Sequence, residues 1–182
     1  MKKAIVFIDG SNFYYRLKHI IKKGANNTSL LDFNYRKFCL WLCKDFEVVE
    51  MRYYIGVVRR KNNDQKSEKL YNNQQRLFRK LQKHNVKIVL GMLIQHPDKT
   101  YHEKGVDVRL AVEMIKLARE DKYDTAFLIS SDTDLVPAVE EVLLLGKKVK
   151  YIGATDSQSF GLSKITGDYL ILRPEDVELF LK

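Results

Sequence analysis

Cysteine is scarce in this chain, and apolar runs of membrane length are missing. The two cysteines, Cys39 and Cys43, lie four residues apart, and no histidine stands near them in sequence to complete a zinc site. We therefore expect two buried free thiols in a reducing cytoplasm. No apolar stretch approaches the ~20 residues that a membrane helix needs, and the N-terminal apolar run is interrupted at Asp9, unlike a signal peptide. The sequence thus predicts a cytoplasmic protein that makes no membrane contact.

Proline and glycine are also few, with three prolines and nine glycines in 182 residues. They form no linker, and the chain shows no repeat and no low-complexity tract. A length of this order is enough for one domain with a full core. We therefore predict a single domain over residues 1–182.

Acidic residues are outnumbered by basic ones, 23 to 32, which gives a net charge of +9. Such an excess favours polyanionic partners, and nucleic acid is the natural candidate. The alternative is a basic protein whose charge only keeps it in solution.

Short apolar runs alternate with helical patterns along most of the chain. Residues 4–8 and 125–129 are continuous apolar runs, typical of strands buried on both faces. Further strands are predicted at 47–58, 86–90, 148–152 and 169–172, and helices at 11–23, from 32, at 64–83, 106–120, 134–145 and 157–163, and after 174. Residues 92–101 form an irregular or strand-like segment. This alternation predicts an α/β fold with a mostly parallel sheet and helices on both faces.

Four aspartates stand where predicted strands end or a predicted helix begins. Asp9 follows the first strand, Asp107 opens the helix at 106–120, and Asp132 and Asp134 follow the strand at 125–129. Because the carboxyl ends of parallel strands meet at one crevice, we expect these side chains to converge. Carboxylates packed together repel one another unless a hard cation such as Mg²⁺ or Mn²⁺ neutralises them. On a basic chain, this arrangement indicates phosphodiester chemistry on nucleic acid.

Helix capping is the alternative for Asp107 and for the pair after residues 125–129, and an ordinary turn residue is the alternative for Asp9. Asp107 falls on the apolar stripe of its helix, with Leu110 and Met114, and for this residue alone capping is the simpler interpretation. Asp134 or Thr133 is suited to cap the helix at 134–145. The joint placement of all four at neighbouring strand ends favours a shared site.

Several motifs together resemble a known family. They are Phe-Ile-Asp9-Gly-Ser-Asn12, Lys104-Gly-Val-Asp107-Val, Ser-Ser-Asp132-Thr-Asp134-Leu-Val-Pro137 and Leu-Gly146-Lys-Lys-Val. In this order, over residues 3–172, the chain resembles the NYN domain family, the LabA-like bacterial proteins of the PIN-like nuclease superfamily. The resemblance implies a PIN-like α/β/α sandwich and a ribonuclease site dependent on Mg²⁺ or Mn²⁺. Its acidic cluster would be Asp9, Asp107, Asp132 and Asp134, with Asn12 as a polar companion.

The resemblance also implies a role for each residue of this site. Asp9 and Asp132 would bind the metal directly, while Asp107 and Asp134 would bind a second ion or orient water. Asn12 would hydrogen-bond a phosphate oxygen or a ligating carboxylate. In-line attack by water would leave a 5′-phosphate and a 3′-hydroxyl.

Two other functions are compatible with parts of the sequence. The family usually has glycine where this chain has Ser131, which favours a catalytically weak RNA-binding or regulatory module. A phosphohydrolase that forms an aspartyl phosphate would need a second aspartate two residues after Asp9, where Ser11 stands.

Basic residues gather on the predicted helix at 64–83, opposite an apolar face made of Leu70, Leu77, Phe78 and Leu81. We expect single-stranded RNA to bind there and near the acidic cluster, with Tyr14 and Tyr15 able to stack on bases. The side chains predicted to contact RNA are Lys104, Arg59, Arg60, Lys69, Arg76 and Lys80. The apolar residues near the C-terminus, Val177, Leu179, Phe180 and Leu181, would pack on the sheet or form a homodimer.

Overall fold

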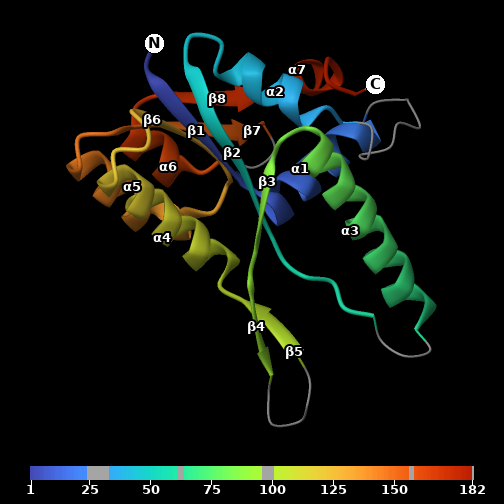
Figure 1. The fold of residues 1–182 in the computed structure, drawn as a ribbon. Helices are drawn as coiled ribbons and strands as arrows, with labels where there is room; N and C mark the ends of the chain where they lie inside the picture. The colour runs from blue at the N-terminus through green and yellow to red at the C-terminus, as the bar shows by residue number, and fades with distance from the viewer. Residues whose placement is uncertain (24–32, 61–63, 96–100, 156–157, 182) are drawn as a thin grey trace.

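A computed structural model describes residues 1–23, 33–60, 64–95, 101–155 and 158–181. A six-stranded parallel sheet lies at its centre, with strand order β3-β2-β1-β6-β7-β8 (Figure 1). The elements in chain order are β1 (Lys3–Asp9), α1 (Gly10–Lys23), α2 (Tyr35–Leu42), β2 (Glu47–Ile55), α3 (Gln65–Lys83), β3 (Lys87–Leu90), β4 (Met92–Gln95), β5 (Tyr101–Lys104), α4 (Val106–Arg119), β6 (Thr125–Ile129), the 3₁₀ turn η2 (Thr133–Leu135), α5 (Val136–Leu144), β7 (Lys148–Ala154), α6 (Phe160–Thr166), β8 (Tyr169–Leu172) and α7 (Pro174–Glu178).

Helices cover both faces of this sheet (Figure 1). Successive side chains of β1 point to opposite faces, as the two-residue period of a strand requires. Ala4, Val6 and Ile8 join a core with α1, α2, α3 and α7, whereas Ile5 and Phe7 join a second core with α4, α5 and α6. The predicted three-layer α/β/α sandwich with a parallel sheet is therefore confirmed.

Strand β1 holds the position that matters most for a site. It pairs with β2 on one side and with β6 on the other, so the chain builds one half of the sheet and then crosses to build the second half. In open parallel sheets this reversal leaves a crevice at the carboxyl ends of the two central strands. Here those ends are Asp9 of β1 and Ile129 of β6.

A β-hairpin projects from the sandwich between β3 and α4 (Figure 1). Strands β4 and β5 are antiparallel, with Met92 opposite Lys104 and Gln95 opposite Tyr101. The sequence indicated only an irregular or strand-like segment here, because each strand has four residues. The hairpin leads directly into α4 through Gly105, whose φ of 83° lies in the left-handed region that suits glycine.

The beginnings of several helices differ from their predicted positions; α5 begins at Val136 rather than at 134, and α6 at Phe160 rather than at 157. Helix α1 begins at Gly10, and the carboxylate of Asp9, not Ser11, caps it by accepting a hydrogen bond from the Asn12 N–H at 3.1 Å. Helix α2 begins at Tyr35 and is capped by Asn34, while the predicted start at residue 32 lies outside the described residues. Polar side chains just before an apolar stretch compete for the capping position, and the sequence alone does not rank them.

Two other predictions about apolar residues have different outcomes. Leu70 of α3 was expected in the core but is 50% exposed, because buried Ser67 and Gln74 take the inward positions around it. Val177 and Phe180 pack in the core against α1 and α2, which leaves Leu179 as the exposed apolar residue of that segment.

Both cysteines are buried free thiols, as predicted. No helix in the described part of the chain combines the length and apolar character needed to cross a membrane.

Gly10 joins β1 to α1 at a point where the backbone is tightly enclosed. Its carbonyl oxygen accepts a hydrogen bond from the Tyr53 hydroxyl at 3.0 Å, and the ring of Tyr53 is fully buried beside it. A Cβ at position 10 would clash with that ring and would lie 2.5 Å from the carbonyl oxygen of Tyr54. Only glycine lets the first turn of α1 approach β2 this closely.

We expect Gly10→Ala to lower the free energy of unfolding by about 1–3 kcal/mol, because a backbone carbonyl and a buried ring must both move. Urea unfolding followed by circular dichroism measures this loss. Gly161→Ala is the matched control, since its Cβ would meet Val136 at 3.3 Å and alanine favours the helix there. Equal stability of Gly10→Ala and the wild type would contradict the close packing.

Candidate functional site

Asp9 occupies the centre of the crevice, at the end of β1, and is only 4% exposed. One carboxylate oxygen caps α1, and the other accepts a hydrogen bond from the Ser130 hydroxyl at 2.8 Å. Burial raises the pKa of Asp9, and the charges of Asp107 and Asp132 raise it further, against the two hydrogen bonds, which lower it. Asp9 is therefore a carboxylate held rigidly in place whose negative charge its surroundings do not fully compensate.

The segment after β6 presents two more carboxylates to the same crevice. Asp132 caps the η2 turn by accepting a hydrogen bond from the Asp134 N–H at 3.0 Å. The Asp132 N–H in turn donates to the Ser130 hydroxyl at 3.1 Å, so Ser130 connects the ends of β1 and β6. The predicted caps, Asp134 or Thr133, are therefore wrong: Asp132 caps the η2 turn, and α5 begins after Leu135 without a side-chain cap.

Asp107 reaches the cluster from the first turn of α4. It was expected on the core-facing stripe, but its side chain is exposed, while Leu110 and Met114 are fully buried. The N-cap of α4 is Gly105, so Asp107 does not occupy the capping position. Partial desolvation and the charges of Asp132 and Asp134 raise the pKa of Asp107.

Asp9, Asp107 and Asp132 therefore lie within electrostatic range of one another, and Asp134 lies within range of Asp107 and next to Asp132. Their donor atoms are all carboxylate oxygens, which is the chemistry that Mg²⁺ and Mn²⁺ prefer. Among the described residues, however, no three acidic, histidine or cysteine side chains are close enough to form a complete metal-binding group. Mg²⁺ is commonly held by one or two protein carboxylates together with water and substrate phosphate, so an open carboxylate set of this kind fits such an ion.

Ser131, which stands where the family usually has glycine, adopts a backbone conformation open to any residue. Among the described non-glycine residues, positive φ occurs at Asn85 and Asp121, not at Ser131. The substitution therefore imposes no left-handed strain on the loop that carries Asp132.

Three side chains near the cluster were not singled out in these roles by sequence. Buried Ser130 bridges Asp9 and the η2 turn, and Tyr53 holds Gly10. Arg16 of α1 lines a small crevice with Asn12, Ser130 and Ser131, and its buried Nε has no hydrogen-bond partner among the residues that the structure describes. A helical spacing from Asn12 to Arg16 is the available signal, since residues four apart share a helix face.

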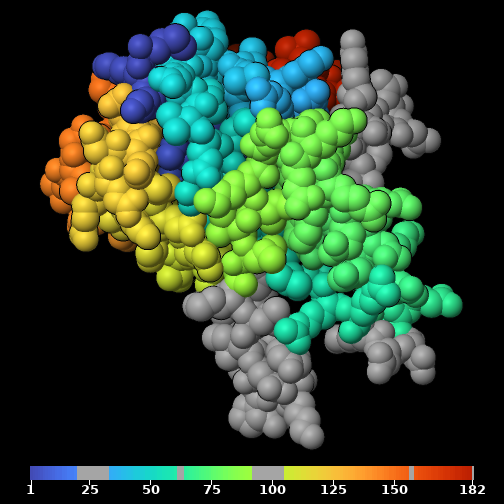
Figure 2. Space-filling model, in the orientation of Figure 1, coloured from blue at the N-terminus to red at the C-terminus, as the bar shows by residue number. Residues whose placement is uncertain are grey.

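Some of the residues predicted to contact RNA lie on α3, and the others lie outside this helix. On α3, Lys69 and Arg76 are exposed, Lys80 is half-buried, and the helix occupies one flank of the molecule (Figure 2). Arg60 lies 4.4 Å from the centre of the Tyr71 ring, so it packs on α3 while its charge stays at the surface. Arg59 is exposed beside it, and the Lys104 side chain lies outside the described part of the structure.

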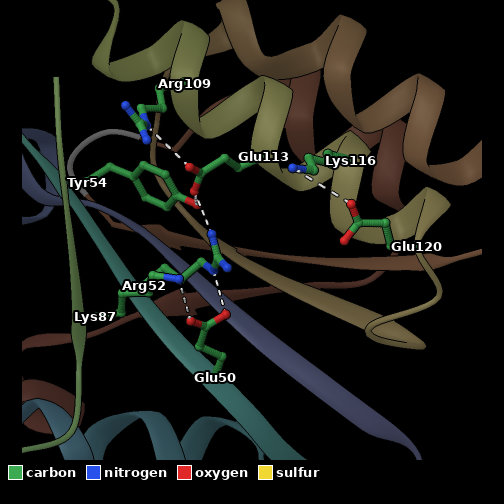
Figure 3. Close-up of polar contacts among 8 residues, drawn as sticks. All are labelled: Glu50, Arg52, Tyr54, Lys87, Arg109, Glu113, Lys116 and Glu120. Carbon is green, nitrogen blue, oxygen red and sulfur yellow. Dashed lines mark hydrogen bonds and ion pairs between the residues drawn. The ribbon is translucent and has the colours of Figure 1, made fainter. Parts of the chain in front are cut away.

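A cluster of ion pairs fixes α4, and therefore Asp107, relative to the sheet (Figure 3). Arg52 of β2 is 7% exposed and donates to Glu50 at 2.7 Å and to Glu113 of α4 at 2.6 Å. Tyr54 and Arg109 also donate to Glu113, at 3.0 and 3.2 Å. Desolvation pushes the pKa of Glu113 upward, but these donors together hold it below its usual value.

We expect Arg52→Met to destabilise the protein by about 3 kcal/mol, because it leaves two partly buried carboxylates without their shared cation. Thermal and urea unfolding at neutral pH measure this loss. Lys116→Met is the control, since its exposed pair with Glu120 at 3.8 Å contributes only about 0.3–0.5 kcal/mol. Losses of equal size in the two variants would show that the cluster does not anchor α4.

We expect Asp107→Asn to be more stable than the wild type at neutral pH in the absence of divalent cations. Because the folded-state pKa is raised above the reference value of 3.8, the stability that Asp107 contributes is present below pH 3.8 and is lost as pH rises through the raised pKa. The advantage of the variant should therefore shrink on acidification. Unfolding in EDTA across this range tests the sign, with exposed Asp45→Asn as the control. Lower stability of Asp107→Asn at neutral pH would contradict the inferred repulsion.

Comparisons with known proteins agree with this architecture. A protein of unknown function from Vibrio parahaemolyticus, solved by crystallography, superposes with a TM-score of 0.70 at 22% identity, covering 100% of this chain and 96% of that chain. An uncharacterized protein from Methanocaldococcus jannaschii is 36% identical over 74 residues, which are 41% of this chain and 30% of that relative. The NYN domain family model matches residues 3–171, nearly the whole chain. The chain therefore belongs to the NYN domain family, part of the PIN-like nuclease superfamily, and has the fold of a nuclease-type hydrolase.

Proposed function

We propose that this protein is a metal-dependent ribonuclease that hydrolyses phosphodiester bonds of single-stranded RNA at its acidic cluster. The observation that carries the proposal is the placement of Asp9 and Asp132 after the adjacent strands β1 and β6, with Asp107 of α4 close enough to raise the pKa of Asp9. Uncompensated carboxylates are costly to gather at one place. Binding of a divalent cation and a phosphate at this site would neutralise the carboxylates and explain why they are placed together.

Asp9 and Asp132 would hold the cation, because their positions are fixed by hydrogen bonds from the Asn12 N–H, Ser130 and the Asp134 N–H. Asp107 and Asp134 are exposed at the mouth of the cluster, where they could orient the attacking water or hold a second ion. A bound Mg²⁺ or Mn²⁺ would polarise the phosphoryl oxygen and stabilise the leaving oxygen.

Arg16 and Asn12 complete the site from the side of α1. They share a small crevice with Ser130 and Ser131, the two residues that precede Asp132 in the chain. A phosphate oxygen entering this crevice would give the buried Arg16 Nε–H the acceptor that it lacks within the described chain. In-line attack by water would leave a 5′-phosphate and a 3′-hydroxyl, and formation of a 2′,3′-cyclic phosphate would contradict this mechanism.

A catalytically weak RNA-binding module on the same fold is the second candidate. It is favoured by the open carboxylate set, in which no three described side chains form a complete metal-binding group. Ser131 does not favour it through backbone strain, because φ at Ser131 is not positive.

We expect end-labelled single-stranded RNA to be cleaved with Mn²⁺ and left intact with EDTA. Asp132→Asn should lower the cleavage rate by about 100-fold, since it removes a charge at the reacting centre while its amide oxygen can still cap η2. Gel analysis of the products at equal protein concentration measures both effects.

Asp45→Asn serves as the control, because Asp45 is exposed in the turn after α2 and lies outside the cluster. Equal RNA binding by the wild type and Asp132→Asn, without cleavage by either, would favour the binding module. Cleavage that persists in Asp132→Asn would place the reaction elsewhere.

A further inference from the structure

A groove of about 460 Å³ lies between α1, the end of β2 and the middle of α3. Its walls are the rings of Tyr14, Tyr15 and Tyr35 and the aliphatic side chains of Ile55, Val58, Leu70 and Leu77. Asn73 and Arg76 of α3 add an amide and a guanidinium at its side. The volume falls in the range of pockets that hold small organic ligands, roughly 300–1,000 Å³.

The groove begins directly beside the acidic cluster. Gly10 and Ser11 line it, and they are the two residues that follow Asp9 in the chain. The crevice that holds Asn12 and Arg16 lies on another side of the same helix. A ligand that extends from Asp9 past Gly10 and Ser11 would therefore have one part at the carboxylates and a flat, apolar part in the groove.

The walls of the groove are shaped in advance. The Gln74 side chain accepts a hydrogen bond from the Val58 N–H at 2.8 Å and donates to the Gly56 carbonyl, which ties α3 to the chain leaving β2. Tyr35 is 1% exposed and forms a fixed floor, whereas Tyr15 is 68% exposed and stands at the rim. A preformed site loses less conformational entropy when it binds.

We infer that this groove binds one unpaired nucleobase of the RNA whose phosphate lies at the acidic cluster. A base has two flat apolar faces that stack on aromatic rings, and a polar edge that an amide can recognise through both a donor and an acceptor. Tyr14 and Tyr15 supply the rings, and Asn73 supplies the amide. The inference rests on the proposed function, because RNA is taken as the ligand.

Charge complementarity favours this occupant over an apolar side chain of a protein partner. Lys69, Asn73, Arg76 and Lys80 follow one another at spacings of three and four residues, so they form one stripe along α3. Arg76 belongs both to this stripe and to the wall of the groove. A sugar-phosphate backbone along the stripe would place its bases toward the groove and its anionic charge on the cations.

The test compares two fluorescent probes of the same length, oligouridylate and an oligomer of abasic ribose phosphates, in EDTA so that no cleavage occurs. Anisotropy titrations give the affinity of the wild type, Tyr15→Ala and Leu70→Glu for each probe. Tyr169→Ala and Leu144→Glu are the matched controls, since both residues are exposed on β8 and α5, away from the groove.

The wild type and both controls should bind the base-containing probe about tenfold more tightly than the abasic one. This preference should disappear in Tyr15→Ala and Leu70→Glu, while the affinity for the abasic probe stays the same in Tyr15→Ala. Tyr15 and Leu70 are exposed, so circular dichroism should show intact folding in both variants.

Equal affinity of the wild type for the two probes, or an equal preference in Tyr15→Ala and Tyr169→Ala, would overturn the inference. Because these titrations contain no metal, the outcome is independent of cleavage. A base preference in a protein that cuts no RNA would refute the nuclease alone, whereas cleavage without a base preference would refute the base-binding groove alone.

Discussion

The burial of the Asp9 carboxylate at the end of β1, beside the end of the adjacent parallel strand β6, is the constraint on which the candidate site depends. β1 and β6 are buried on both faces and pair directly, so the residues that follow them emerge side by side. Asp9 is the last residue of β1, and Asp132 follows the end of β6. The Ser130 hydroxyl is hydrogen-bonded to both residues. Burial and like charge raise the pKa of Asp9, which means that the fold tolerates an unfavourable electrostatic arrangement at its centre.

Much of the surrounding structure keeps these charges in place. Gly10 allows α1 to begin immediately after Asp9, and the Tyr53 hydroxyl holds that junction. On the other face, Arg52 and Glu113 connect β2 to α4, so that Asp107 stays near Asp132 (Figure 3). Rigid positioning of groups whose repulsion opposes folding is expected of a functional site, where local stability is exchanged for reactivity. The basic stripe on α3 and the groove beside α1 would then guide the polyanion to the carboxylates.

The sequence was sufficient for the features that depend on local pattern. The apolar runs at 4–8 and 125–129 became the central strands, and Asp9 and Asp132 lie close together because adjacent parallel strands end at one edge. Asp107 approaches them from α4, after the β4–β5 hairpin. The features that sequence did not predict depend on tertiary contacts. Leu70 has the periodicity of a core residue, but Gln74 satisfies two backbone groups inside the fold and leaves Leu70 in the wall of a groove. The Arg52–Glu113 pair joins residues 61 positions apart in the chain, so no local pattern predicts it. The burial of the Arg16 Nε depends on the packing of α1 against the end of β6, which the sequence does not show.

The most direct test of the central claim is a titration of the metal-free protein with Mn²⁺, followed by electron paramagnetic resonance of the free ion. If the aspartates form a shared cation site, the wild type will remove free Mn²⁺ from solution saturably, Asp132→Asn will not, and Asp45→Asn will match the wild type. Undiminished free Mn²⁺ with the wild type, or equal binding by Asp132→Asn, would show that the carboxylates at the ends of β1 and β6 serve the fold rather than a metal.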